Sequence, residues 1–224
     1  MPSSVRRIGR PLTIDQLLIA DPPGAWRAAG FEVVGDTCVA GGVRLRLEGP
    51  GRRRGIVGWS VRGAAALDID GLPTTASENP PPATAREHPN GVLAVDHVVA
   101  FTPDLDRTTA TLRAAGLDLR RVRDEPTPGG APRQAFFRVG EVILEVVQAP
   151  AGTRIAGDPS GPARLWGISF LVEDLVHTAA TLGDLLGEPR AAVQPGREIA
   201  TLRKDAGLGP AVAFMTPGPG GSTV

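Results

Sequence analysis

The feature of this 224-residue sequence that most constrains its fold is an internal repeat. Each copy begins with an apolar run of strand length, continues with a segment of helical spacing and ends with three shorter strand-like runs. The first copy occupies residues 92–150 and the second occupies residues 163–217. Pro103-Asp104-Leu105 in the first copy aligns with Glu173-Asp174-Leu175 in the second, and the match continues through the helix without a gap. An ungapped match in the same order of elements favours a true duplication over a chance likeness.

Local signals place the elements within each copy. In the first copy, Leu105, Thr109 and Leu112 recur at helical spacing. Asp104 precedes them as an N-cap, and Gly116 follows as the glycine that ends a helix. Strands are expected at 93–101, 117–123, 134–139 and 141–147 in the first copy, and at 165–172, 191–194, 199–203 and 211–215 in the second, with the second helix at 173–182. The sequence therefore predicts an α+β fold in which tandem βαβββ units form a curved mixed sheet around a pocket.

Residues 1–75 contain a shorter echo of the same unit. Ala28-Ala29-Gly30-Phe31 resembles Ala114-Ala115-Gly116-Leu117 of the first copy. A helix is expected at 22–29, and strands are expected at 14–20, 37–40, 43–47 and 55–62. We interpret this segment as a partial, degenerate third unit with one extra strand.

Proline and glycine mark the boundaries between segments. Residues 76–91 contain Asn79-Pro80-Pro81-Pro82, and because proline cannot donate to a strand ladder, this stretch is expected to be a linker. The predicted organisation is thus a partial unit at 1–75, a linker at 76–91, a domain of two units at 92–217 and a flexible tail at 218–224.

Composition removes several classes of protein. The chain has 24 basic and 24 acidic residues, so no excess of positive charge suggests nucleic-acid binding. Its single cysteine, Cys38, excludes an internal disulfide framework and any multi-cysteine metal site. No apolar run reaches the roughly 18 residues of a membrane span, and the N-terminus lacks the apolar core of a signal peptide. A cytoplasmic protein with neither a membrane nor a nucleic-acid partner is expected. Nucleophile-elbow, phosphate-loop and dinucleotide-binding motifs are absent from the sequence.

Three motifs in the first copy resemble a known family. Asp96-His97-Val98-Val99, Pro103-Asp104-Leu105 and Val142-Ile143-Leu144-Glu145-Val146-Val147 together resemble the first half of a vicinal-oxygen-chelate domain, the superfamily of glyoxalases, bleomycin-resistance proteins and dioxygenases. The resemblance covers residues 93–216. It implies two units that form a cupped sheet around a pocket. In many members, four residues bind a divalent metal, one from the first strand and one from the last strand of each unit.

The resemblance assigns ligand positions residue by residue. His97 matches the first-strand ligand of the first copy and Glu145 matches its last-strand ligand. In the second copy, the same offsets fall on Gly167 and Phe214, neither of which binds a metal. In the N-terminal segment, Gln16 falls at the first-strand position and is a candidate third ligand.

Two interpretations of the cofactor follow from these assignments. His97, Glu145 and Gln16 could hold one divalent metal, with Zn, Ni, Fe or Mn suited to nitrogen and oxygen ligands. Alternatively, His97 and Glu145 are catalytic or binding side chains in a metal-free pocket. The loss of both ligands from the second copy favours the protein having no cofactor.

Other side chains are candidates for contact with a substrate. Trp166 lies beside the missing first-strand ligand and Phe214 at the missing last-strand ligand, so both are expected to line the pocket. Of Phe136 and Phe137, which alternate in a strand, Phe137 is taken as the pocket residue. Arg123 is taken as a substrate-binding residue.

The basic strand that contains Arg123 has two interpretations. With Arg120 and Arg121 it could bind a carboxylate or phosphate, or the three could only solvate an exposed sheet face. Strand alternation would direct Arg121 and Arg123 to one face and Arg120 to the other. His88 in the linker and His177 in a helix are expected to be solvated.

The resemblance implies a divergent glyoxalase-like protein that acts on or holds a small organic molecule in its sheet cavity. The alternatives are a metal-free binding protein of the bleomycin-resistance type and a metal-dependent isomerase or lyase. An extradiol dioxygenase is disfavoured, because the chain has three histidines and no tyrosine. Dimers are common in the family, so both a homodimer and a monomer are open.

Overall fold

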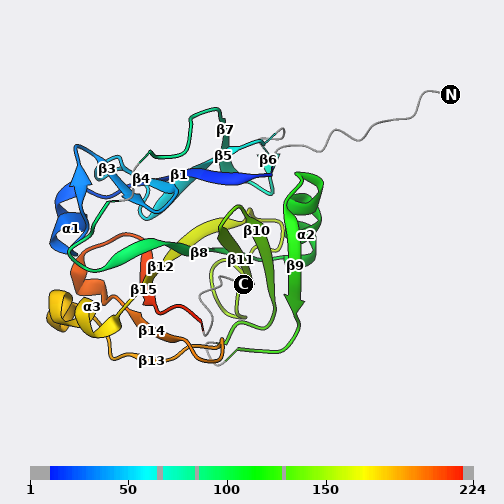
Figure 1. Cartoon of the computed structure of the whole chain (residues 1–224). Coiled ribbons are helices and arrows are strands. Elements are labelled where there is room, and N and C mark those ends of the chain that lie inside the picture. The colour runs from blue at the N-terminus through cyan, green and yellow to red at the C-terminus, as the bar shows by residue number, and fades with distance from the viewer. Residues whose placement is uncertain (1–10, 65–67, 84–85, 128–129, 219–224) are drawn as a thin grey trace.

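The computed structural model describes residues 11–64, 68–83, 86–127 and 130–218, so most of the predicted flexible tail lies outside the described residues. Two curved mixed sheets lie against each other, with the N-terminal module above the C-terminal module in Figure 1. The N-terminal elements are β1 (Thr13–Ile19), α1 (Pro23–Ala28), β2 (Val33–Val34), β3 (Thr37–Ala40), β4 (Val43–Leu47), β5 (Ile56–Arg62), β6 (Asp68–Ile69) and β7 (Leu72–Ser77). The C-terminal elements are β8 (Val92–Thr102), α2 (Leu105–Ala114), β9 (Asp118–Arg123), β10 (Gln134–Val139), β11 (Val142–Gln148), β12 (Arg164–Val172), α3 (Leu175–Leu182), β13 (Arg190–Ala191), β14 (Glu198–Thr201) and β15 (Ala211–Met215).

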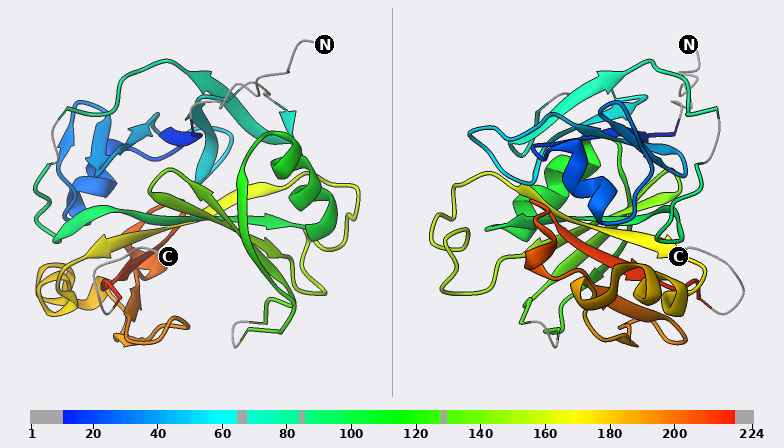
Figure 2. Two further views of the ribbon diagram at one scale, coloured as in Figure 1. Left: turned by 45° about the vertical axis from the view of Figure 1, so that its right-hand side comes forward. Right: turned by 90° about the vertical axis from the view of Figure 1, so that its left-hand side faces the viewer.

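The C-terminal sheet confirms the predicted duplication. Its strand order is β13-β14-β15-β12-β8-β11-β10-β9, so each copy contributes four neighbouring strands. The two first strands, β8 and β12, pair antiparallel at the centre, and each last strand runs parallel to the first strand of its own copy. Asp104 and Asp174 cap α2 and α3 by accepting hydrogen bonds from the backbone of the first turn. Figure 2 shows how strongly this sheet is curved.

The N-terminal sheet follows the same plan and is more extensive than one partial unit. Its order is β2-β3-β4-β1-β5-β7-β6, in which β1, α1 and β2 to β4 form a complete βαβββ unit. The expected extra strand, β5, pairs antiparallel with β1, as β12 does with β8. Strands β6 and β7 then follow β5 in the position of a second, shorter unit. The chain therefore contains the two-unit arrangement twice, once in each sheet.

The same irregularity occurs in both modules. In each module the pairing of the two central strands skips one aspartate, Asp15 in β1 and Asp96 in β8, which marks a β-bulge. The residue after the bulge is Gln16 in β1 and His97 in β8. The structure thus supports the sequence alignment that paired Gln16 with His97.

An aromatic cluster joins the modules. Trp26 and Phe31 from the N-terminal unit pack against Phe170 of β12 and Phe214 of β15, all with an exposed fraction of 2% or less. The ring centroids of Phe31 and Phe170 lie 5.0 Å apart, in a tilted arrangement favourable for aromatic pairs. The faces of the two sheets that meet here are therefore core faces, and the concave face of the C-terminal sheet on its other side is free to form a cavity.

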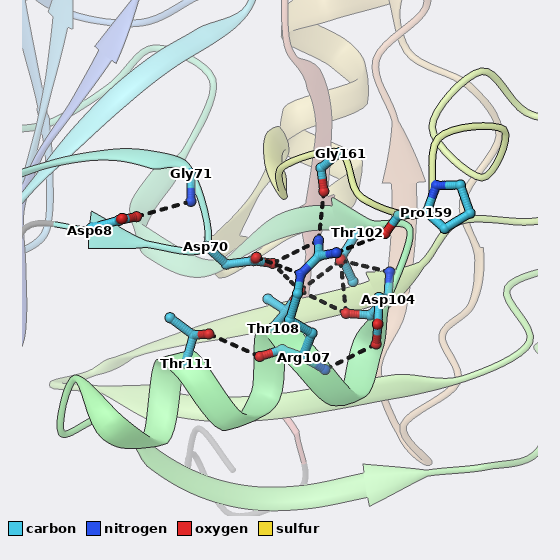
Figure 3. Close-up of polar contacts among 10 residues, drawn as sticks. All are labelled: Asp68, Asp70, Gly71, Thr102, Asp104, Arg107, Thr108, Thr111, Pro159 and Gly161. Carbon is cyan, nitrogen blue, oxygen red and sulfur yellow. Dashed lines mark hydrogen bonds and ion pairs between the residues drawn. The ribbon is translucent and has the colours of Figure 1, made fainter.

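A polar tether fixes the edge of the interface. Asp70, between β6 and β7, accepts hydrogen bonds from Arg107 Nε at 2.7 Å and from the Thr108 hydroxyl, both on α2 (Figure 3). Arg107 also donates to the carbonyl oxygens of Pro159 at 2.7 Å and Gly161 at 2.5 Å. Asp70 has a φ of 50°, in the left-handed region that Asp and Asn tolerate better than most residues.

We expect Asp70→Ala to lower the free energy of unfolding by about 2–3 kcal/mol, because it removes the acceptor of a charged hydrogen bond and places alanine at a positive φ. Asp70→Asn keeps the backbone preference and one acceptor, so its loss should be smaller. Urea unfolding measures both. Equal losses in the two variants would contradict a role for the tether.

The single cysteine is inert by burial. Cys38 lies in β3 with no exposed surface, and burial followed by the charge of Glu32 raises the pKa of its thiol to about 12. We expect no reaction with a thiol reagent at pH 8 until the protein unfolds. Ellman's reagent with and without denaturant measures this, and fast labelling of the native protein would contradict it.

One linker histidine differs from expectation. His88 is 7% exposed: its Nδ1 accepts from the Glu32 backbone N–H at 3.0 Å, and its Nε2 lies 2.9 Å from the carbonyl oxygen of Val39. Burial lowers its pKa, against smaller raising effects of Val39 and Glu32. The expectation of a solvated linker histidine was wrong, because the chain after β7 packs back onto the N-terminal unit.

Within the described chain, every helix is too short or too polar to span a bilayer.

Candidate functional site

A cavity of about 290 Å³ lies on the concave face of the C-terminal sheet. Both copies contribute to it, and both outermost strands of the sheet, β9 and β13, line it. Its lining comprises Asp96, His97, Arg120, Arg121, Arg123, Gln134, Phe136, Ile143, Glu145, Arg190, Ala192, Val193, Gln194, Pro195, Arg197, Ile199 and Met215. The cavity therefore combines an apolar wall with a polar set of side chains, the usual composition of a small-molecule site.

The predicted pair of functional residues meets in this cavity. His97 on β8 and Glu145 on β11 lie on adjacent parallel strands, and His97 Nε2 is 3.7 Å from Glu145 Oε2. That separation is too long for a hydrogen bond. The other carboxylate oxygen of Glu145 accepts a hydrogen bond from the Gln134 side chain. His97 and Glu145 are half-buried, and Gln134 is buried. All three line the cavity, and together they form what we call its polar floor.

A buried ion pair between Asp96 and Arg197 contacts His97 through Asp96. His97 Nδ1 lies 2.8 Å from Asp96 Oδ2, and Asp96 Oδ1 accepts from Arg197 Nη2 at 2.6 Å. Arg197 also donates from Nε to the Thr216 carbonyl oxygen at 2.7 Å. Burial alone would raise the pKa of Asp96, but hydrogen bonds and charge from His97 and Arg197 outweigh it and lower that pKa. A charged Asp96 fixes the ring of His97 with Nε2 facing the cavity.

The structure separates the predicted substrate-binding residues into two groups. Arg123 lines the cavity. In β10, Phe136 faces the cavity opposite Glu145, whereas Phe137 faces the core and is fully buried. Trp166 is 49% exposed and packs edge-to-face on Phe101, outside the cavity lining. The pairing of β12 with β8 skips Trp166, which marks a β-bulge.

The register of β15 corrects the position of Phe214. In the first copy Ile143 pairs with His97, and in the second Ala211 pairs with Gly167, so the residue equivalent to Glu145 is Ala213. Phe214 is one residue further along and points to the opposite face, into the aromatic cluster.

Gln16 lies in the other sheet, outside the cavity lining. Beside it, the bulge residue Asp15 is fully buried and binds the guanidinium groups of Arg44 and Arg62. Ser77, the last residue of β7, and Asn79, which follows that strand, donate to the same carboxylate at 2.5 Å and 3.0 Å. The buried carboxylate of Asp15 is thus paired with side chains of the N-terminal module itself.

The residues present do not fit the four-ligand metal site of the fold. His97 and Glu145 are the two donors that converge, while Gly167 and Ala213 occupy the remaining positions. Throughout the described residues, no three His, Cys, Asp or Glu side chains come together as a metal would require.

Sequence inspection missed the contribution of the second copy. Arg190 and Arg197 flank the short strand and loop at 190–197, and nothing in their local pattern distinguishes them from surface arginines. The strand β9 also differs from simple alternation. Its pairing with β10 skips Arg120, so this bulge allows Arg120 and Arg121 to lie on the same side, and both line the cavity with Arg123.

Comparison with solved structures defines the class of fold. Over 92% of this chain and 93% of that chain, the structure matches a mutant of 4-hydroxymandelate synthase from Streptomyces coelicolor, with a TM-score of 0.65 and 15% sequence identity. It matches a xylose isomerase-like TIM barrel/4-hydroxyphenylpyruvate dioxygenase fusion protein over 93% of this chain and 49% of that chain, with a TM-score of 0.61 and 12% identity. Methylmalonyl-CoA epimerase from Mycobacterium tuberculosis matches over 58% of this chain and 91% of that chain, with a TM-score of 0.48 and 18% identity.

The synthase and the dioxygenase fusion protein belong to the vicinal-oxygen-chelate superfamily, and on these two matches the chain has the fold of that superfamily. The match to the synthase spans nearly the whole chain, so both modules take part in it. No family model matches the sequence, and no curated protein matches it. The likeness at these identities defines the fold, and the chemistry of the site has to be argued from its residues.

Proposed function

We propose that this protein binds a small organic molecule in the C-terminal cavity, and that His97 and Glu145 contact the molecule directly. The observation that supports this proposal is a cavity of about 290 Å³ whose floor carries both side chains. Their 3.7 Å separation leaves the pair without a direct hydrogen bond. A ligand group that donates to Glu145 and accepts from or donates to His97 would satisfy both.

The experiment is a titration in the presence of EDTA, with ligand-observed NMR and calorimetry as readouts. The probes are 2-phenylacetamide, phenylacetate, phenyl phosphate and 2-phenylethylamine, which share an aromatic body and differ in charge. We expect at least one probe to bind with chelator present, and His97→Ala to weaken it about tenfold, the effect of losing one hydrogen bond to a polar ligand group.

The matched control is Gln16→Ala, the equivalent position in the N-terminal sheet, which should leave binding unchanged. Loss of binding on addition of EDTA, recovered by zinc or manganese, would support a metal-dependent isomerase or lyase instead. Failure of all four probes would contradict the proposed function.

Proton transfer on the bound molecule is a second candidate, favoured by the contact between Asp96 and His97. Because Asp96 accepts the hydrogen bond from Nδ1, Nε2 of a neutral ring carries the lone pair that a general base needs. Deuterium exchange at the methyl group of pyruvate in D2O, followed by NMR, tests this. We expect a rate above that of buffer that is lost in His97→Ala, and a rate equal to that of buffer would reject catalysis.

A further inference from the structure

The cavity concentrates positive charge in a chain whose net charge is zero. Its lining contains two carboxylates, Asp96 and Glu145. It also contains five arginines: Arg120, Arg121, Arg123, Arg190 and Arg197. Counting only these arginines and carboxylates, the lining carries an excess of three positive charges, five minus two. Such an excess at the wall of a concave site attracts and retains anions.

Two of these arginines have no acidic partner. Arg197 is paired with the buried Asp96 at 2.6 Å, and Arg120 and Arg123 form pairs with carboxylates outside the cavity. Arg121 and Arg190 form no ion pair with any residue that the structure describes. Their guanidinium groups are therefore available to a ligand.

The fold brings these two arginines to one cavity from opposite ends of the sheet. Arg121 lies on β9 and Arg190 on β13, the first and last strands in the order of the eight-stranded sheet (Figure 1). The curvature of the sheet places both at the cavity lining. A flat sheet of this order would hold them about 34 Å apart, since neighbouring strands are spaced roughly 4.8 Å apart.

The surroundings of Arg121 favour a specific contact over simple solvation. Its guanidinium carbon lies 5.6 Å from the centroid of the Phe136 ring, a cation–π arrangement that orients the group over the apolar wall. Phe136, Ile143, Ile199 and Met215 supply that wall. Planar guanidinium groups bind carboxylate and phosphate oxygens in pairs, and the wall suits an apolar body.

Resting on the proposed function, we infer that the ligand is an organic anion, a carboxylate or phosphate on an apolar skeleton, bound by Arg121 and Arg190. The anionic group lies toward the two edge strands, and the body of the ligand extends along Phe136 toward the floor formed by His97 and Glu145. The arginines select the charge of the ligand, and the floor contacts its other polar group.

The same four probes test this inference separately from the proposed function. We expect phenylacetate and phenyl phosphate to bind at least tenfold more tightly than 2-phenylacetamide, and 2-phenylethylamine to bind most weakly. The relative affinities of the two anions then decide between a carboxylate and a phosphate ester. Equal or tighter binding of the amide or the amine would overturn the inference while leaving the proposed function intact. Failure of all four probes would overturn both.

Variants of Arg121 and Arg190 test where the anionic group of the ligand binds. Arg121→Gln combined with Arg190→Gln should weaken the tighter anion about tenfold or more and leave the affinity for the amide within about twofold, because only the charged hydrogen bonds are lost. Arg203→Gln, which removes an exposed arginine outside the cavity lining, is the matched control and should change neither affinity. Since all three positions are exposed, the variants are expected to fold, and circular dichroism checks this. An unchanged anion affinity in the folded double variant would overturn the assignment.

Discussion

Replacing Arg197 by methionine is expected to lower the free energy of unfolding by about 3–5 kcal/mol, the range found when one partner of a buried ion pair is removed. Arg197 and Asp96 have side chains that are 6% and 3% exposed, so water cannot replace the lost guanidinium. The change also leaves the Thr216 carbonyl oxygen without its donor at 2.7 Å. Chemical denaturation of the purified variant measures the loss.

A double-mutant cycle separates the ion pair from general damage. If the cost comes from an uncompensated buried charge, adding Asp96→Asn to Arg197→Met should recover part of the stability, because the amide removes that charge. Strictly additive losses would contradict the explanation. In ligand titrations, Arg197→Met should also weaken binding at His97, since Asp96 would no longer be held in place.

The ion pair between Arg197 and Asp96 also predicts how the free energy of unfolding changes at acidic pH. The folded-state pKa of Asp96 lies below its ordinary value of 3.8, so the folded protein binds this proton less readily than the unfolded chain. The contribution of Asp96 is therefore complete above pH 3.8 and is lost as the pH falls toward the lower folded value. In Asp96→Asn, the stability should fall less steeply over that window. An identical slope in both proteins would contradict the assignment.

The second large effect is expected for Phe214→Ala, a loss of about 3–5 kcal/mol. Phe214 is fully buried between the modules, its centroid 6.2 Å from that of Phe170 and 6.3 Å from that of Phe31. Its removal leaves a void in the aromatic cluster that the rigid sheets on either side cannot close. Thermal and urea unfolding measure the change.

Binding provides the discriminating measurement for Phe214. Because its side chain faces away from the cavity, the folded fraction of Phe214→Ala should bind the cavity probes with unchanged affinity. Trp166→Ala is the matched control: this ring is 49% exposed, so its loss should cost less than about 1 kcal/mol. A selective loss of probe affinity in Phe214→Ala would contradict the register of β15.

The duplicated unit could be predicted because its signals are local. The caps Asp104 and Asp174 and the apolar spacing within each element act over a few residues, and the structure has each element near its predicted place. The places of His97 and Glu145 in the cavity lining could be predicted for the same reason, since both residues lie in motifs on single strands. Asp15 and Asp96 directly precede Gln16 and His97 in the sequence, but the bulge at each aspartate was not predicted.

The sequence-based predictions that were wrong concern strand register and contacts between segments that are distant in the sequence. A one-residue difference in register moved the ligand position from Phe214 to Ala213, because successive side chains in a strand point to opposite faces. Bulges at Arg120 and Trp166 changed which side chains share a face. Pairing energies at these positions come from neighbouring strands, so the sequence of one strand cannot specify them.

By itself, the sequence determined the tandem βαβββ units, the curved sheet that they build and the two polar residues that survive in the first copy. The tertiary structure alone decided what surrounds them. It packed Phe214 into the interface of the modules, satisfied Asp15 within the N-terminal sheet and curled β9 and β13 around one cavity. Apolar periodicity and caps are properties of a few consecutive residues, whereas the charge of a cavity depends on residues that only the closed sheet brings together.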